Sequence, residues 1–214
     1  MLKALDIMKV SPIIPVVSIE KASSALPLAE ALFEGGIGIM EITLRTPQAL
    51  EAIEIVSKQM PSMCVGAGTV LNESQFAQVQ ERGASFVISP GMTQSLLEYS
   101  SKSEVPFIPG VATASDIMQG LEYDLNAFKL FPANIVGGPK AIASFKGPFK
   151  DVLFCPTGGI NLNNAAEYLN LENVLCVGGT WVSPSSLLKA GDYKQISRIC
   201  KSSLEHITEG KSHE

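Results

Sequence analysis

The sequence predicts a TIM barrel, the (β/α)8 fold in which a ring of eight parallel strands is surrounded by eight helices. Short apolar or β-branched runs recur roughly every 20 to 25 residues along the 214-residue chain, and there are eight of them. Segments with helical spacing separate the runs, so strand and helix alternate throughout. The runs are almost continuously apolar, which is typical of parallel strands covered on both faces. We therefore expect one domain over residues 1–214, with a short helix before the first strand.

The eight runs are all short enough to be single strands, and the first is not followed by a glycine-rich turn. A Rossmann or flavodoxin-like sheet would need fewer strands or such a turn, whereas the first run continues as "PVVSIEKAS". The barrel is therefore favoured. In chain order the predicted strands are Pro12–Ile19, Ile39–Leu44, Cys64–Val70, Phe86–Pro90, Pro106–Val111, Ala127–Phe131, Val152–Thr157 and Val174–Trp181.

The segments between the runs carry helix start and stop signals. "TPQALEAIEIVSKQM" predicts a helix with Thr46 as its N-cap and Pro47 in its first turn. "NESQFAQVQERG" predicts a helix that Asn72 opens and Gly83 closes. The N-terminal "MLKALDIMKV" alternates apolar and charged residues like a short amphipathic helix and lacks the continuous apolar core of a signal peptide.

Composition limits the partners and the location that we expect. With 46% apolar and 17% charged residues, the chain can bury a sizeable core. Its net charge is -5 and its basic residues form no stripe, which gives no reason to expect nucleic acid. No apolar run approaches the roughly 18 residues that a membrane helix needs. We expect a cytoplasmic protein whose partner is a small molecule, with no nucleic acid and no membrane.

The chain offers no sequence signal for a metal or an organic cofactor. Both histidines, His206 and His213, lie in the C-terminal tail, so neither a His-based metal site nor a Ser-His or Cys-His pair is expected at the barrel mouth. There is no P-loop and no GxGxxG after the first strand. The cysteines form no CxxC pair, and we expect all four to be reduced and structural: Cys64, Cys155, Cys176 and Cys200.

Lys129 stands inside the apolar run "AFKLFP", whereas the other twelve lysines lie in helix-like or loop segments. A buried ammonium costs several kcal/mol unless it is paired or loses its proton. One interpretation is structural, with Glu41 as the counter-ion. The other is catalytic, because burial favours a neutral amine, which can attack a ketone to give a Schiff base. The protonated imine would then allow the neighbouring carbon–carbon bond to break.

The second predicted strand, "IMEITLRT", carries two further candidates. Residues two apart share a strand face, so Glu41, Thr43 and Arg45 should point the same way. Glu41 is the only carboxylate inside a predicted strand and is therefore the candidate acid/base. Arg45, at the strand end, is placed to hold a substrate carboxylate bidentately, or else to form an ordinary surface ion pair.

Double glycines follow the last two predicted strands, in "PTGGI" and "VGGTW". TIM barrels commonly bind phosphate after these two strands, where backbone N–H groups and helix N-termini can face an anion. A single Gly-Gly is usually only a turn. Two such pairs, with the hydroxyl groups of Thr157 and Thr180 beside them, predict a phosphate site.

Taken together, these motifs resemble the class I aldolases that act on 2-keto-3-deoxy-6-phosphogluconate (KDPG) and 4-hydroxy-2-oxoglutarate (KHG). The likeness covers nearly the full length of the chain, and the matching motifs stand in the family's order: "EITLRT", "VGAGTVL", "ISPG", "FKLFPA", "FCPTGGI" and "VLCVGGTW". The resemblance implies that Lys129 forms the Schiff base and that Glu41 is the general acid/base. It also implies a homotrimer, which nothing in the spacing shows.

The resemblance extends to the residues that would hold the substrate. It implies that Arg45 and Thr69 line a pyruvate-carboxylate pocket, with Pro90 shaping its wall. Thr180 stands where the family has serine and keeps the hydroxyl group. The distal end of the substrate and its phosphate would be served by Thr157, Gly158, Gly159, Gly179 and Thr180.

The activity that the resemblance implies is a reversible, metal-independent retro-aldol cleavage. KDPG would give pyruvate and glyceraldehyde 3-phosphate, as in the Entner–Doudoroff pathway, and KHG would give pyruvate and glyoxylate. The same imine could also decarboxylate oxaloacetate. Two alternatives stay open: an aldolase for the galactonate epimer of KDPG, and a non-catalytic barrel that binds a phosphorylated sugar and uses Lys129 only as a counter-ion.

Overall fold

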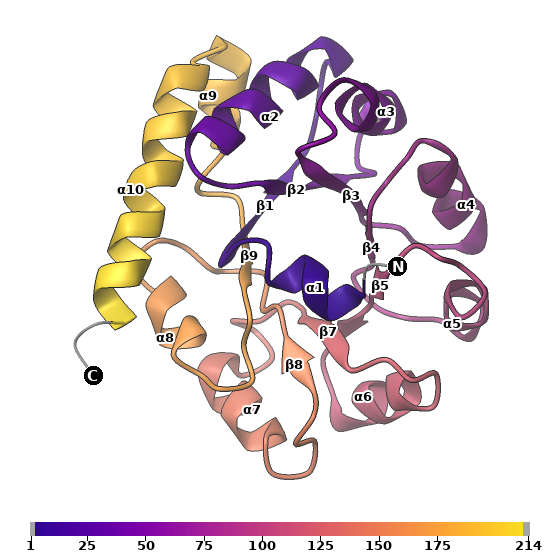
Figure 1. The fold of residues 1–214 in the computed structure, drawn as a ribbon. Coiled ribbons are helices and arrows are strands. Elements are labelled where there is room, and N and C mark those ends of the chain that lie inside the picture. The colour runs from indigo at the N-terminus through magenta and orange to yellow at the C-terminus, as the bar shows by residue number, and fades with distance from the viewer. Residues whose placement is uncertain (1–2, 212–214) are drawn as a thin grey trace.

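Parallel strands form a ring at the centre of the molecule, and helices cover the outside of the ring (Figure 1). The computed structural model describes residues 3–211, with side chains to residue 208. The strands are β1 (Ile13–Val17), β2 (Ile39–Thr43), β3 (Cys64–Gly68), β4 (Val87–Ile88), β5 (Phe107–Ile108), β6 (Gly110–Val111), β7 (Ala127–Leu130), β8 (Leu153–Phe154) and β9 (Val177–Gly179).

Strand pairing runs round the ring in two sheets. One has the order β5-β4-β3-β2-β1-β9 and the other the order β6-β7-β8, and every pair is parallel. Isolated bridges, Phe154 to Val174 and Thr157 to Gly178, connect β8 to β9 and the residues before it. β5 and β6 are parts of one predicted run, interrupted at Pro109. The predicted TIM barrel is confirmed, although its hydrogen-bonded ladder is not continuous.

Each predicted strand run contains an observed strand, but most observed strands are shorter. Proline explains part of the difference, because it has no N–H to donate to a neighbouring strand. Pro109 separates β5 from β6, and its carbonyl oxygen accepts a hydrogen bond from Lys129 N at 2.9 Å. The run that ends at Pro90 likewise retains only the two residues of β4.

Helices connect successive strands on the outside of the ring. They are α1 (Ala4–Met8), the 3-10 turn η1 (Ala22–Ser24), α2 (Ala25–Glu34), α3 (Ala49–Gln59), α4 (Glu73–Glu81), α5 (Gln94–Ser100), α6 (Ala114–Leu121), α7 (Gly138–Phe145), α8 (Ala165–Leu169), α9 (Ser185–Ala190) and α10 (Tyr193–Lys211).

One of the two predicted N-caps is confirmed and the other is wrong. The side chain of Asn72 accepts a hydrogen bond from Gln75 N at the start of α4, and Gly83 follows that helix with a φ of +83°. Thr46 does not cap α3, which begins after Gln48. The hydroxyl group of Thr46 instead donates to Ile19 O at 2.6 Å, so it joins the turn after β2 to the segment after β1.

The predicted N-terminal helix is confirmed as α1, which packs at the amino-terminal end of the ring. Ile7 and Met8 of α1 are buried, and a cavity of about 430 Å³ separates the helix start from residues 105–107 and 125–127, where β5 and β7 begin. The amino-terminal end is therefore covered by α1. The opposite, carboxyl end of the ring is where the predicted site residues lie.

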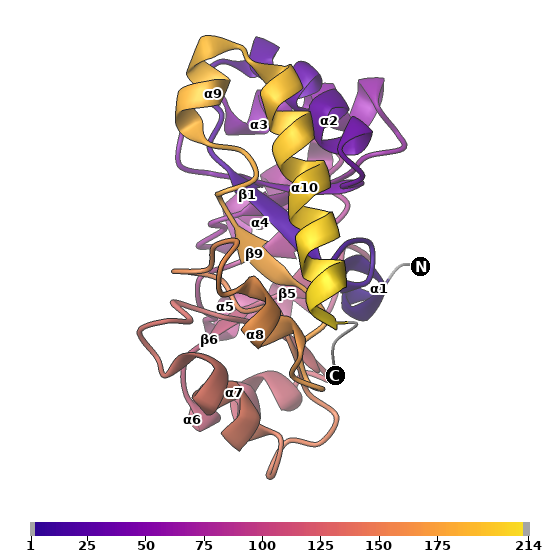
Figure 2. The same cartoon turned by 90° about the vertical axis from the view of Figure 1, so that its left-hand side faces the viewer.

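Helix α10 runs along the outside of β1 and β9, beside α2 (Figures 1 and 2). Two hydrogen bonds tie it to the segment after β9: Trp181 Nε1 donates to Ser203 Oγ at 3.2 Å, and Cys200 Sγ donates to Val182 O at 3.6 Å. The four cysteines are free, as expected. Within residues 3–211, no helix is long and apolar enough to cross a membrane.

Candidate active site

Lys129 and Glu41 meet inside the ring. Lys129 belongs to β7 and Glu41 to β2, and their Nζ and Oε1 atoms are 3.2 Å apart. The two side chains are only 5% and 1% exposed. Among the lysines whose side chains the structure describes, Lys129 is the only buried one. The ring of Phe131 lies below the amine, with 5.4 Å between Nζ and the ring centroid, and so adds a cation–π contact.

Gly68 makes room for the Glu41 carboxylate. Strand β3 lies beside β2, and a Cβ atom at Gly68 would overlap Glu41 Oε1 and approach Glu41 Cγ to 2.6 Å. A side chain at this position would displace the Glu41 carboxylate. Glycine inside a strand often marks a close approach of this kind, so Gly68 in "VGAGT" is a sequence signal for this contact.

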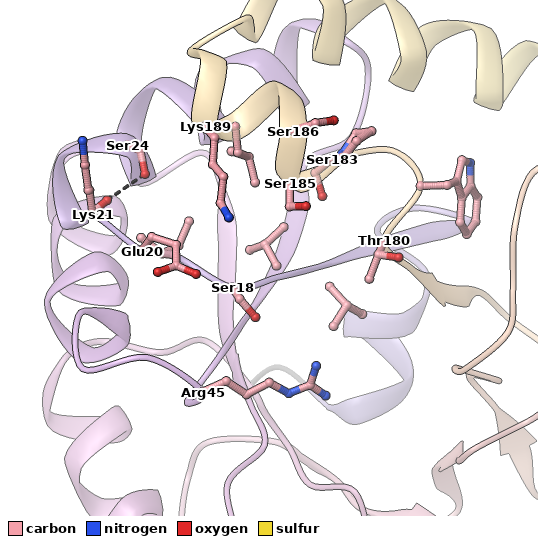
Figure 3. Close-up of a pocket in the computed structure, with 16 residues that line it drawn as sticks. Ser18, Glu20, Lys21, Ser24, Arg45, Thr180, Ser183, Ser185, Ser186 and Lys189 are labelled. Carbon is pink, nitrogen blue, oxygen red and sulfur yellow. Dashed lines mark hydrogen bonds between the residues drawn. The ribbon is translucent and has the colours of Figure 1, made fainter.

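The end of β2 is tied to β1 next to this pair. Thr43 is buried, as a neighbour of Glu41 on the same strand face should be. Its hydroxyl group donates to Val17 O at 2.9 Å and lies 2.8 Å from Ser18 Oγ. Arg45 follows in an exposed turn and extends into a cavity (Figure 3).

This cavity of about 840 Å³ lies at the carboxyl ends of β1, β2 and β9. Arg45 and Thr180, which the sequence predicts to hold opposite ends of the substrate, both line it. Lys129 and Glu41 are not among the lining residues. The structure therefore brings the predicted residues together in two groups, a buried pair inside the ring and a cavity at its mouth.

Thr69 and Pro90 follow β3 and β4, also at the carboxyl end. Thr69 has a φ of +59°, a left-handed conformation that is rare for a β-branched residue and costs roughly 1–3 kcal/mol. Strain of this kind clusters at functional sites. Pro90 lies very close to Gly110 of β6, since a Cβ atom at Gly110 would overlap the carbonyl oxygen of Pro90. The roles of Thr69 in the pyruvate-carboxylate pocket and of Pro90 in its wall stay predictions.

The Gly158-Gly159 turn needs glycine for its backbone conformation. The φ values are +99° and +77°, in the region that glycine adopts without steric cost. The turn is held against the loop after β7, because Asn134 N donates to Gly158 O at 3.1 Å. Neither glycine N–H donates a hydrogen bond to the residues that the structure describes. Both N–H groups are thus available to an anion.

Thr157 and Gly179 have packing roles beside the predicted phosphate site. The buried hydroxyl group of Thr157 lies against Gly178, where a Cβ atom would overlap it, and it donates to Cys155 O at 3.4 Å. A Cβ atom at Gly179 would overlap the ring of Trp181. Contact with this ring accounts for glycine at 179, so a role in phosphate binding stays a prediction for that residue.

Residues 3–208 contain no group of three or more His, Cys, Asp or Glu side chains placed to hold a metal ion. His206 is exposed on α10, and His213 lies outside the described residues. Burial raises the pKa of the Cys64 thiol to about 11 and that of Cys200 to about 12, and it also raises the pKa of Cys176. Thiols with raised pKa values are poor nucleophiles at neutral pH.

The chain is similar to proteins of one known family. The family model for KDPG and KHG aldolase matches residues 5–199. The 2-dehydro-3-deoxy-phosphogluconate aldolase of Pseudomonas aeruginosa is 48% identical over 201 residues, which cover 94% of this chain and 91% of the relative.

Two solved structures are similarly close. A KDPG aldolase from Legionella pneumophila, with pyruvate captured at low pH as a covalent carbinolamine intermediate, has a TM-score of 0.93 and 46% identity over 95% of this chain and 98% of that one. The Zymomonas mobilis KDPG aldolase with 3-phosphoglycerate has a TM-score of 0.88 and 44% identity, covering 94% of each chain. The resemblance found in the motifs is confirmed, and the chain belongs to the KDPG and KHG aldolase family.

Proposed function

We propose that this protein is a class I aldolase that reversibly cleaves KDPG to pyruvate and glyceraldehyde 3-phosphate, and KHG to pyruvate and glyoxylate. The observation that carries the proposal is the buried pair of Lys129 and Glu41, 3.2 Å apart inside the ring. A carbinolamine is the adduct of an amine and a ketone, and the Legionella relative holds pyruvate in that form. Lys129 is the buried amine that would form the adduct here.

The first step is attack of Lys129 Nζ on the C2 ketone of the substrate. The attacking amine must be neutral, and the Glu41 carboxylate is within reach to take the proton from the ammonium group. Addition gives a carbinolamine. Glu41 then returns that proton to the carbinolamine hydroxyl group, which leaves as water and gives a protonated imine. The positive nitrogen attracts electrons from the bond between C3 and C4.

Cleavage follows when the C4 hydroxyl group loses its proton. Glu41, through a bound water, accepts that proton while the C3–C4 bond breaks and its electron pair moves to the imine as an enamine. The aldehyde leaves, the enamine takes a proton at C3, and hydrolysis releases pyruvate and restores Lys129. The same imine would let oxaloacetate lose carbon dioxide.

The residues at the two ends of the substrate are proposed from the family resemblance. Arg45 and Thr69 would hold the pyruvate carboxylate, with Pro90 at the wall. The free N–H groups of Gly158 and Gly159, together with the Thr180 hydroxyl group, support a phosphate site at the other end. Thr157 and Gly179 would shape that end mainly through packing.

A coupled assay tests the proposed function. Pyruvate released from KDPG and from KHG is measured with lactate dehydrogenase and NADH, before and after dialysis against EDTA. We expect cleavage of both substrates at a rate that dialysis does not change, because Lys129 supplies the electron sink. A rate that EDTA removes and a divalent metal restores would instead indicate an enolate held by an ion, and no cleavage of either substrate would refute the proposal.

A homotrimer stays an implication of the family resemblance, and a cytoplasmic location stays a prediction from the sequence. Analytical ultracentrifugation would test the first, with a species of about three times the 22.8 kDa chain mass as the expected result.

A further inference from the structure

The 840 Å³ cavity carries an excess of positive charge. Three cations line it, Arg45, Lys21 and Lys189, against the single carboxylate of Glu20. Figure 3 shows the Arg45 and Lys189 side chains extending into the hollow from opposite sides. Neither forms an ion pair with any residue that the structure describes. A cavity with unpaired cations of this kind is suited to a negatively charged ligand.

Lys189 lies on α9, beyond the residues assigned to the catalytic site. It stands in the last turn of that helix, where a cation is favoured by the helix dipole. That effect accounts for a positive residue at the position and does not require its amine to enter the cavity. The helix dipole therefore does not explain why the Lys189 side chain extends into the cavity (Figure 3).

Ser183 provides an independent observation at the same wall. The residue lines the cavity and is 5% exposed, yet its Oγ has no hydrogen-bond partner within the described part of the chain. A buried hydroxyl group without a partner costs about 1–3 kcal/mol. The Oγ atom is enclosed in its present position, so the side chain would have to rotate about the Cα–Cβ bond to another staggered position to reach a ligand. A ligand oxygen in the cavity would give the hydroxyl group the partner that it lacks.

We propose that Lys189 and Ser183 form a second anchor for the anionic distal group of the substrate and make the enzyme selective for phosphorylated 2-keto acids. The proposal rests on the proposed function. KHG has no phosphate and is too short to need this anchor, whereas KDPG ends in a dianion. Lys189 would hold that dianion from the α9 side of the cavity that Thr180 also lines.

The decisive experiment replaces Lys189 with methionine and compares the two substrates. Lys189→Met should lower kcat/KM for KDPG about tenfold, mainly through KM, because one charge-assisted hydrogen bond is lost. For KHG the change should be less than twofold. Lys194→Met, an exposed lysine on α10 outside the cavity, is the matched control and should change neither value. Equal losses on both substrates, or none on KDPG, would overturn the assignment.

Ser183→Ala gives a second measurement that does not depend on turnover. The variant removes an unsatisfied hydroxyl group, so Tm of the free protein should not fall. The rise in Tm that inorganic phosphate produces should become smaller, because a ligand partner is lost. An unchanged phosphate-induced rise would show that the Ser183 hydroxyl group does not meet the ligand and would remove it from the anchor.

Failure of this inference and failure of the aldolase proposal give different results. If the wild-type protein cleaves KDPG and Lys189→Met cleaves it equally well, only the second anchor falls. If the wild-type protein cleaves neither substrate, the proposed function falls and the anchor with it.

Discussion

Lys129 and Glu41 form a buried ion pair inside the ring. Burying either charge alone would cost several kcal/mol, and the contact between them offsets part of that cost. Such a pair is seldom the most stable solution, since apolar residues of the same size often stabilise as well or better. The proposed roles, Lys129 as the catalytic amine and Glu41 as its proton acceptor, would account for a buried pair at this place.

Glu41→Gln tests the acid/base role at this scale. The amide has the shape of the carboxylate but cannot accept the proton, so turnover of KDPG should fall roughly 10²–10⁴-fold. Circular dichroism must show that the variant is folded, because a buried Lys129 without a carboxylate is itself destabilising. Turnover that stays near the wild-type rate in a folded variant would remove Glu41 from the mechanism.

Gly68→Ala tests the position of the same carboxylate without removing it. The new methyl group would occupy the place of Glu41 Oε1, so the side chain must turn away from Lys129 and kcat should fall by at least about tenfold. Gly147→Ala is the control, because a Cβ atom there would meet its nearest neighbour at an ordinary 3.7 Å. Equal kcat values for the two variants would contradict the geometry.

Lys129 and Glu41 could be predicted as candidate site residues because each is a charged residue inside an apolar strand. A lysine and a glutamate in apolar strands were visible from the pattern alone. Ser183 and Lys189 were not, because a serine or lysine in a loop or helix looks like ordinary solvated surface. Only the folded chain brings both to the cavity at the carboxyl ends of β1 and β9.

Among the elements, the strand order was predictable and the element ends were not. The alternation of apolar runs and helical segments predicts the barrel. It could not show that Thr46 would donate a hydrogen bond to Ile19 instead of capping α3, because Ile19 is distant in the sequence. Nor could it show that α10 would hold the segment after β9 through Trp181 and Cys200.

Thr180→Val tests the role of that segment. A substitution at Gly179 would be ambiguous, because any side chain there displaces Trp181. Thr180 is exposed, and valine keeps its branched shape while removing the hydroxyl group. We expect KM for KDPG to rise severalfold, corresponding to a lost hydrogen bond of about 1 kcal/mol, with KM for KHG nearly unchanged. The same rise for both substrates would place Thr180 outside the phosphate end.

The raised pKa values of the Cys64 and Cys200 thiols predict how the free energy of unfolding of the whole molecule depends on pH. The folded-state pKa values of Cys64 and Cys200 are raised from 9.0 to about 11 and about 12. Above pH 9 the unfolded chain releases thiol protons that the folded chain keeps, so the free energy of unfolding should fall between pH 9 and 11. The slope is at most about 1.4 kcal/mol per pH unit for each thiol. In urea unfolding, Cys200→Ala should show a shallower decline, and an identical slope would contradict this origin.

Trapping of the imine is the most direct test of the central claim, that Lys129 forms a Schiff base with the substrate ketone. The protein is incubated with pyruvate and sodium borohydride, and its intact mass is measured before peptide mapping. The account predicts a stable gain in mass that maps to the peptide holding Lys129 and is lost in Lys129→Arg, because arginine keeps the charge but cannot form the imine. No gain in mass, or an adduct on another residue, would contradict it.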